Sequence, residues 1–334
     1  MKKTRLLAVL LLIMTVLGSC TKESTDVDYV VGAWESRSQF EGLARSAAVS
    51  FVINGKGYVG LGTDGSDKYK DFWEYTPATN TWRQIADFPG VGRYQAVAFA
   101  ANGKGYVGTG YDGLNRLKDF WEYDPSTNTW AQKADFAGSA RYGAVAFAIN
   151  DKGYVGTGYD GNYKKDFWQY DPLADAWTQK PSFGGNKRLG ASAFVVNNEG
   201  YICTGLDNGT YQTDNWSYNP STETWAEHRP LILNDDNVAG DNYNFSAVPR
   251  AYGVAFSIGN TGFVALGSKD SQLTNCWAYS PTDDNWYQKT DFGGSSRTSA
   301  VAFGLGDYGY IGLGANGSTR YDDLWILEPN ADVD

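Results

Sequence analysis

The sequence predicts an all-β fold built from six copies of one four-stranded unit, and three observations support this prediction. Arginines recur with gaps of 48, 48, 47, 62 and 47 residues, at Arg45, Arg93, Arg141, Arg188, Arg250 and Arg297. Tryptophans keep the same period, at Trp73, Trp121, Trp168, Trp216, Trp277 and Trp325. A phenylalanine lies five residues before each arginine, at Phe40, Phe88, Phe136, Phe183, Phe245 and Phe292. Self-similarity at a fixed period of this length is the signature of a repeat architecture.

Each copy contains the signals of four short strands. The alanine-rich run after the arginine, such as residues 96–100, predicts an innermost strand near a crowded axis. Asn102 and Gly103 predict a hairpin, because both residue types tolerate positive φ. A Gly-Tyr-Val-Gly run and a Phe-Trp-Glu-Tyr run predict the second and third strands. The fourth strand follows a proline-containing turn and carries a second tryptophan, at Trp82, Trp130, Trp177, Trp225 and Trp286. Four twisted antiparallel strands per copy, arranged radially, form the blades of a β-propeller.

The two ends of the chain predict how the ring closes. The sixth copy ends near Asp334 without a final tryptophan strand, whereas Trp34 lies six residues before Phe40, as Trp82 lies before Phe88. We therefore expect residues 34–39 to form the outer strand of the sixth blade. That pairing leaves no blade with an open edge, so the prediction is a six-bladed ring.

These motifs resemble the kelch-repeat family over nearly all of residues 33–329. The matching features are a glycine after the second strand, a tyrosine in the third strand and a tryptophan beyond the proline-containing turn. The glycines are Gly62, Gly110, Gly158, Gly205, Gly267 and Gly314. The residue before each of them, which is glycine in the family, is leucine or threonine here, and this indicates a divergent branch. The resemblance implies a kelch-type β-propeller.

The N-terminal residues are typical of a targeting signal rather than of folded structure. Lys2, Lys3 and Arg5 precede an apolar run, and residues 17–20 end at Cys20 in a pattern that resembles the bacterial lipobox. We expect a signal peptide over residues 1–19, a lipidated tether over 20–32 and the propeller over 33–334. The alternative is an ordinary signal peptide with a stray cysteine. Acylation of Cys20 would make the chain a lipoprotein of the bacterial envelope, anchored in the outer membrane on either its periplasmic or its outer side.

Composition excludes several classes of partner and chemistry. Loss of Lys2, Lys3 and Arg5 takes the formal net charge from −10 to −13, which disfavours nucleic acid and bare anionic lipid. We expect a monomer that touches the membrane through its lipid anchor only. His228 is the one histidine, so a copper site of the galactose oxidase type is excluded. No zinc spacing or phosphate-binding loop is present, and we expect neither metal nor cofactor.

The two remaining cysteines, Cys203 and Cys276, lie in strands of neighbouring blades. In an oxidising compartment they could form a disulfide, but the repeat does not need one. Two buried free thiols are therefore the favoured expectation.

The six arginines are the first candidate ligand-binding residues. They begin the innermost strands and should lie near one mouth of the channel, where guanidinium groups would attract a carboxylate, a sulfate or a polar sugar. The favoured alternative is structural, because a polar residue starts the third strand of each copy and could pair with the arginine. These residues are Asp71, Asp119, Asp166, Asp214, Asn275 and Asp322.

The loops on the same face supply further candidates, at Tyr111, Asp112, Tyr159, Asp160, Tyr163 and Tyr211. Tyrosines there could stack on a sugar or a protein partner, or pack against the next blade. An insertion of 14 residues within 227–244 separates blades four and five and contains Asp235 and Asp236. A calcium site in it is conceivable, but Ala239 and Ser246 stand where an EF-hand would need ligands.

From the sequence we therefore expect a non-catalytic, lipid-anchored binding module that presents its loop face to a glycan or an envelope protein. The alternative comes from a second resemblance. A six-bladed kelch ring in the periplasm, as expected for this chain, also resembles the sialic acid mutarotases. This resemblance implies a cofactor-free sugar epimerase or mutarotase with acid and base side chains at the channel mouth. No residue of this chain can be matched to those side chains from the sequence.

Overall fold

The computed structural model describes residues 32–231 and 249–331, which form a ring of six four-stranded antiparallel blades. The innermost strands are β2 (Val49–Ile53), β6 (Val97–Ala101), β10 (Val145–Ile149), β14 (Ser192–Val196), β20 (Val254–Ile258) and β24 (Val301–Leu305). The second strands are β3 (Lys56–Gly60), β7 (Lys104–Gly108), β11 (Lys152–Gly156), β15 (Glu199–Cys203), β21 (Thr261–Ala265) and β25 (Tyr308–Gly312).

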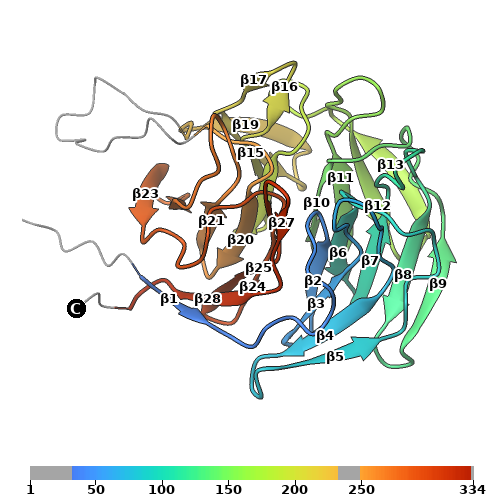
Figure 1. Cartoon of the computed structure of the whole chain (residues 1–334). Coiled ribbons are helices and arrows are strands. Elements are labelled where there is room, and N and C mark those ends of the chain that lie inside the picture. Colours follow the sequence, from blue (N-terminus) through green and yellow to red (C-terminus); the bar gives the residue numbers. More distant parts are fainter. Residues whose placement is uncertain (1–31, 232–248, 332–334) are drawn as a thin grey trace, which may run out of the picture.

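The third strands are β4 (Phe72–Thr76), β8 (Phe120–Asp124), β12 (Phe167–Asp171), β18 (Asn215–Asn219), β22 (Cys276–Ser280) and β28 (Leu324–Glu328). The outer strands are β5 (Thr81–Ile85), β9 (Thr129–Lys133), β13 (Ala176–Lys180), β19 (Thr224–His228), β23 (Asn285–Lys289) and β1 (Ala33–Ser36). In Figure 1, β2, β6 and β10 lie near the middle of the ring, and β5, β9 and β23 lie at its periphery.

The ring closes as the sequence predicts, through its first strand. β1 pairs with β28, with Trp34 opposite Leu327, so blade six consists of β24, β25, β28 and β1. The Trp34 indole nitrogen donates to the Thr290 carbonyl at 3.0 Å, and its ring meets Phe292 edge-on at 5.1 Å. The strand ends at Ser36 rather than near residue 39, although the backbone N–H of Arg37 still donates to the Leu324 carbonyl in the same register. The six-bladed prediction is confirmed.

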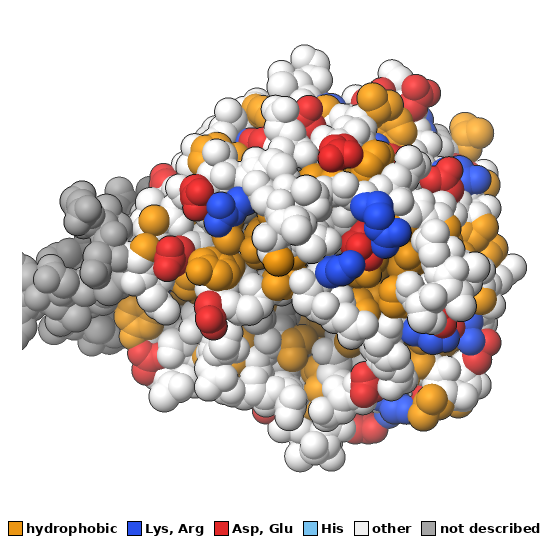
Figure 2. Space-filling view, turned by 90° about the horizontal axis from the view of Figure 1, so that it is seen from below, with side chains coloured by type: hydrophobic (Ala, Val, Ile, Leu, Met, Phe, Trp, Pro, Cys, Tyr) orange, Lys and Arg blue, Asp and Glu red, His pale blue; other side chains and the backbone are white. Residues whose placement is uncertain are grey.

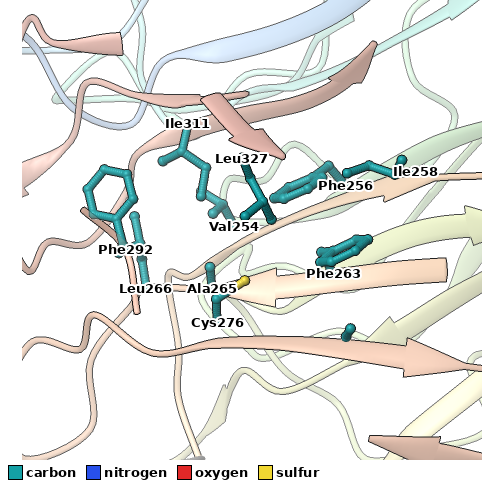
Figure 3. Close-up of a cluster of buried hydrophobic side chains, with 11 residues drawn as sticks. Val254, Phe256, Ile258, Phe263, Ala265, Leu266, Cys276, Phe292, Ile311 and Leu327 are labelled. Carbon is teal, nitrogen blue, oxygen red and sulfur yellow. The ribbon is translucent and has the colours of Figure 1, made fainter. Parts of the chain in front are cut away.

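The blades are held together by a phenylalanine of one blade that packs on a glycine of the next. Phe51 of β2 covers Gly105 of β7 so closely that a side chain at that glycine would run into the ring. Phe99 covers Gly153 in the same way, and the contact recurs at every blade boundary. The glycine of the Gly-Tyr motif is therefore required by the neighbouring blade. Because tyrosines and tryptophans surround each contact, the core is divided into inter-blade clusters, one of which is shown in Figure 3.

Two short ribbons extend the loop face, β16–β17 (Leu206–Asp207 and Thr210–Tyr211) in blade four and β26–β27 (Ala315–Asn316 and Thr319–Arg320) in blade six. Across the part of the chain that the structure describes, no helix is long and apolar enough to cross a bilayer.

Candidate functional site

The six repeat arginines are buried inside the blades and are not open to the mouth. Each has an exposed fraction of 0%. In blade two, Arg93 makes a bidentate pair with Asp119 at 2.6 and 2.7 Å and donates to the Thr109 and Val91 carbonyls at 3.0 Å each. The guanidinium also lies 4.8 Å from the centre of the Phe88 ring. This is the geometry of the structural alternative, in which the arginine fastens the connection between blades to the third strand.

The same pairing recurs in blades one, three, four and six. Burial alone would raise the pKa of Asp71, Asp119 and Asp166, but hydrogen bonds and charge from the paired arginine outweigh burial and lower it. Each of these carboxylates also accepts a hydrogen bond from the tryptophan two residues later, as Asp119 does from Trp121 at 2.8 Å. They are therefore ionised and fully engaged at neutral pH.

One detail of this pairing differs from the sequence-based expectation. The partner of Arg297 is Asp323 rather than Asp322, because Asp323 keeps the two-residue offset from Trp325 that places a carboxylate beside the guanidinium. In blade five an amide replaces the carboxylate, and Arg250 donates to the Asn275 side chain and to the Leu266 carbonyl. Burial lowers the pKa of Arg250 to about 10.

The leucine or threonine that replaces the family's first glycine adopts a left-handed backbone in every blade. In blade three, Thr157 has φ +61° and turns its carbonyl toward Arg141, which donates to it at 2.9 Å. A β-branched residue with positive φ is a genuine outlier. The conformation persists because the arginine needs that carbonyl as an acceptor.

The mouth of the channel is narrowed by main chain. Two residues after each arginine, a residue with φ between +51° and +64° donates its N–H to the equivalent carbonyl of the preceding blade at 2.7 to 3.0 Å. The six hydrogen bonds form a closed circle through Ala47, Gln95, Gly143, Gly190, Tyr252 and Ser299. Below this circle, the channel is a cavity of about 220 Å³ lined by alanine, valine, serine and glycine only. Its wall carries no titratable side chain, so proton-transfer chemistry would have to take place at the mouth.

A run of tyrosines covers the mouth over blades two and three, and we call it the tyrosine arc. It consists of Tyr94, Tyr111, Tyr142, Tyr159 and Tyr163. Successive ring centres lie 5.6, 5.4, 5.7 and 5.1 Å apart, and all five side chains are half-buried. The opposite part of the mouth carries small residues at the same positions, such as Ser46, Thr63, Thr298 and Ala315. One side of the mouth is therefore aromatic, as required for stacking on an apolar face of a ligand.

Of the expected tyrosines, the arc contains Tyr111, Tyr159 and Tyr163, whereas its other two members, Tyr94 and Tyr142, were not among the candidates. Tyr94 and Tyr142 directly follow the repeat arginines Arg93 and Arg141, so their place at the mouth could have been read from the period. Burial raises the pKa of both side chains. Tyr211 lies on β17 and donates to the Lys269 carbonyl of the next blade at 2.9 Å, which is the inter-blade packing that the sequence left open.

Asp112 and Asp160 hold the loops of the arc in shape. The Asp112 carboxylate accepts the N–H groups of Leu114 and Asn115 at 2.7 and 2.6 Å, and these bonds lower its pKa. Burial would raise the pKa of Asp160, but hydrogen bonds from Ser139 and Lys164 lower it to about 2. Both carboxylates are ionised at neutral pH.

Cations also border the arc. The Arg116 guanidinium lies 5.4 Å from the centre of the Tyr159 ring, and Lys164 pairs with Asp160 at 2.9 Å. The surface that is seen from below in Figure 2 carries acidic side chains interspersed with basic ones, although the formal net charge of the chain is −10.

The insertion begins later than the sequence suggests. Leu231 donates its N–H to Thr213, as Phe88 does to Lys70, and is buried where the other blades have phenylalanine. It lies six residues after Trp225, which is the spacing kept elsewhere in the repeat. The extra residues therefore follow Leu231, and residues 227–231 belong to the regular blade. Asp235 and Asp236 lie outside the described residues, as does Cys20.

The remaining candidates lie away from the mouth. His228 ends β19, where its ring nitrogen lies 2.8 Å from the Ser217 hydroxyl. Cys203 and Cys276 are free and buried in different clusters, on the two sides of blade five, and burial raises the pKa of each thiol to about 12. Figure 3 shows Cys276 in the second of these clusters. Within residues 32–231 and 249–331, no group of histidine, cysteine and carboxylate side chains could hold a metal ion.

Comparison with known proteins agrees with this architecture. A model described as the Kelch motif matches residues 92–136, which span blade two. No curated protein matches the chain in a sequence search. A solved structure described as the structure of YjhT superimposes with a TM-score of 0.70 at 18% identity, over 87% of this chain and 96% of that one. Because 902 chains of solved structures match, the likeness identifies an architecture and not an activity. The chain is therefore a six-bladed β-propeller that carries a Kelch motif in blade two, and the residues of that motif recur around the ring.

Proposed function

We propose that this propeller is a binding module that holds a carbohydrate on its loop face, with the sugar stacked on the tyrosine arc. The observation that carries the proposal is the run of five half-buried tyrosine rings on one side of a mouth whose other side is small and polar. Aromatic rings recognise the apolar C–H face of a pyranose, and the neighbouring Arg116 and Lys164 supply donors for its hydroxyl groups.

The protonation states at the mouth favour binding over catalysis. A general acid or base works best with a pKa near the operating pH. The carboxylates beside the arc, Asp112 and Asp160, have lowered pKa values and are held by loop hydrogen bonds. They are suited to shaping the loops rather than to moving protons.

A glycan array probed with the purified full chain tests the proposal. Tyr159→Ala should abolish the signal, whereas Tyr308→Ala, at the opposite end of the channel, should leave it unchanged. Equal signals from both variants would contradict a role for the arc. Co-purification of an envelope protein without any glycan signal would identify the partner as a protein instead.

The second candidate is a cofactor-free sugar epimerase or mutarotase. The comparisons favour it over a non-catalytic module, through the likeness of the whole ring to YjhT. A catalytic mouth would have to recruit groups beyond the two low-pKa carboxylates of the arc. Proton NMR of anomer exchange in N-acetylneuraminic acid decides between the candidates, because a rate above buffer requires catalysis and a rate equal to buffer excludes it for this sugar.

For the cellular location of the protein, we propose attachment to the bacterial envelope through an acyl group on Cys20. Cell fractionation should find the wild-type chain with membranes and a Cys20→Ser variant in the soluble fraction. Retention of that variant in the membrane fraction would contradict the lipid anchor.

A further inference from the structure

Tyr252 has no equivalent among the six residues that close the mouth. The other members of the hydrogen-bonded circle are alanine, glutamine, serine and two glycines, whereas Tyr252 brings a large aromatic ring to the same position. Its φ is +57°, in the left-handed region that bulky residues rarely adopt. A smaller residue would therefore adopt the left-handed backbone conformation of this position more easily than tyrosine does.

The neighbouring blade is shaped to receive this ring. A side chain on Gly190 would come within 2.9 Å of the Tyr252 ring, so the glycine leaves the space that the ring occupies. Gly190 has φ +61° and takes part in the circle through its backbone. The Tyr252 N–H donates to the Gly190 carbonyl at 2.8 Å. The aromatic ring of Tyr252, in blade five, thus lies over Gly190 of blade four.

Tyr252 also extends the tyrosine arc. Along the circle, the Tyr252 N–H donates to the Gly190 carbonyl and the Gly190 N–H donates to the Gly143 carbonyl. Because Gly143 directly follows Tyr142 of the arc, Tyr252 lies toward the aromatic side of the mouth. Burial raises the pKa of Tyr252 to about 12. The side chain remains half-buried, so part of the ring is open to a ligand.

We propose that Tyr252 is the specificity-determining residue of the mouth, the floor on which one pyranose ring of the bound glycan stacks. This inference rests on the proposed carbohydrate site and assigns its ligand class, a hexopyranose that presents a C–H face toward the channel. An aromatic ring kept in a strained backbone conformation, over a glycine that makes room for it, is expected where function rather than stability selects the residue.

The test uses the expectation that the positive φ of Tyr252 costs stability. Tyr252→Gly relieves the positive φ and should leave the thermal midpoint unchanged or higher, while it weakens sugar binding at least about tenfold, as loss of a central aromatic contact does. Ala47→Gly is the matched control, because it relieves φ +54° at the same position of blade one, away from the arc. It should leave affinity unchanged. Tyr252→Phe keeps the ring and should retain affinity within a few-fold.

Affinity is measured by calorimetry on the full chain with three probes, methyl β-galactopyranoside, cellotriose and N-acetylneuraminic acid. A wild-type chain that binds none of them would remove the proposed carbohydrate site and this inference with it. A wild-type chain that binds a probe equally well with Tyr252→Gly would overturn the inference alone. A lower thermal midpoint with unchanged affinity would identify Tyr252 as a packing residue.

Discussion

Asn215 shows how one blade departs from the repeat at the level of single residues. In blades one to three, a glycine of the second strand faces a phenylalanine of the third, as Gly60 faces Phe72, and the glycine makes room for the ring. In blade four the same pair is Cys203 and Asn215. Asn215 is fully buried, and neither its amide nitrogen nor its oxygen has a hydrogen-bond partner among the described residues. A buried polar group left without a partner costs about 1–3 kcal/mol.

Restoring the glycine and phenylalanine together should therefore stabilise the protein. We expect Cys203→Gly with Asn215→Phe to raise the free energy of unfolding by about 2 kcal/mol, since it removes the orphaned amide and adds apolar burial. Asn215→Phe alone should lower it by about 1–3 kcal/mol, because the ring would meet the Cys203 side chain. Urea denaturation of both single variants and the double variant measures the difference. Additive single effects would show that the two side chains do not share one space.

The connection that precedes each inner strand is the element that the arginine fastens. Arg93 joins it to the third strand of blade two through Asp119 and to the second strand through the Thr109 carbonyl. Removal of one partner of a buried pair leaves an uncompensated charge, so Arg93→Ala should cost about 3–5 kcal/mol. Asp119→Asn should cost less, because blade five carries Asn275 at the same position and is folded. A loss below about 1 kcal/mol in Arg93→Ala, measured by urea denaturation, would show that the pair does not fasten the connection.

The pH dependence of stability follows from the same element. The pKa values of Asp71, Asp119 and Asp166 are lowered in the folded state, so the native protein binds fewer protons than the unfolded chain as acid is added. Their stabilising effect is complete above the unfolded value of about 3.9 and is lost as the pH falls through the folded values. The thermal midpoint should be flat near neutral pH and fall steeply below about pH 4. Asp119→Asn should have a shallower fall, and an unchanged slope would contradict the assignment.

The strands could be predicted from the sequence because each of them recurs in every copy of the repeat. The candidate site could not be predicted in this way, because its residues do not recur in every copy. The period identified the four strands of each blade, the hairpin at Asn102, and the closing strand at Trp34. From their positions in the repeat, the arginines were also expected near the mouth. The period could not show that their side chains point into the blades, where they pair with Asp119 and its equivalents. The period marks the positions of Tyr94 and Tyr142, directly after the repeat arginines, but aromatic residues stand at that position in only some of the copies. The period therefore does not predict an aromatic arc, and it does not predict Tyr252, which has no aromatic counterpart at its position in the other blades.

At the scale of the molecule, the ring is closed by four residues. β1 has no turn that links it to β28 and is held by its pairing with β28 and by the contacts of Trp34 with Thr290 and Phe292, whereas β9, in the equivalent place of blade two, is also tied to β8 by a turn. Glu35 pairs with Ile326 as Ala131 pairs with Glu122, so proline substitutions at Glu35 and Ala131 disrupt the same position in a closing and in an ordinary outer strand.

The two proline variants should differ in how far the damage spreads. With Ala131→Pro, faster amide hydrogen exchange should be confined to β8 and β9, because blade two stays tethered on both sides. With Glu35→Pro, loss of the β1 pairing frees the N-terminal segment and exposes the edge of β28, so exchange should quicken throughout blade six and at the start of blade one. Native-state hydrogen exchange followed by mass spectrometry measures both patterns. Equal, local effects in the two variants would mean that the ring holds without its closing strand, and that the circle of hydrogen bonds at the mouth is enough to keep the blades together.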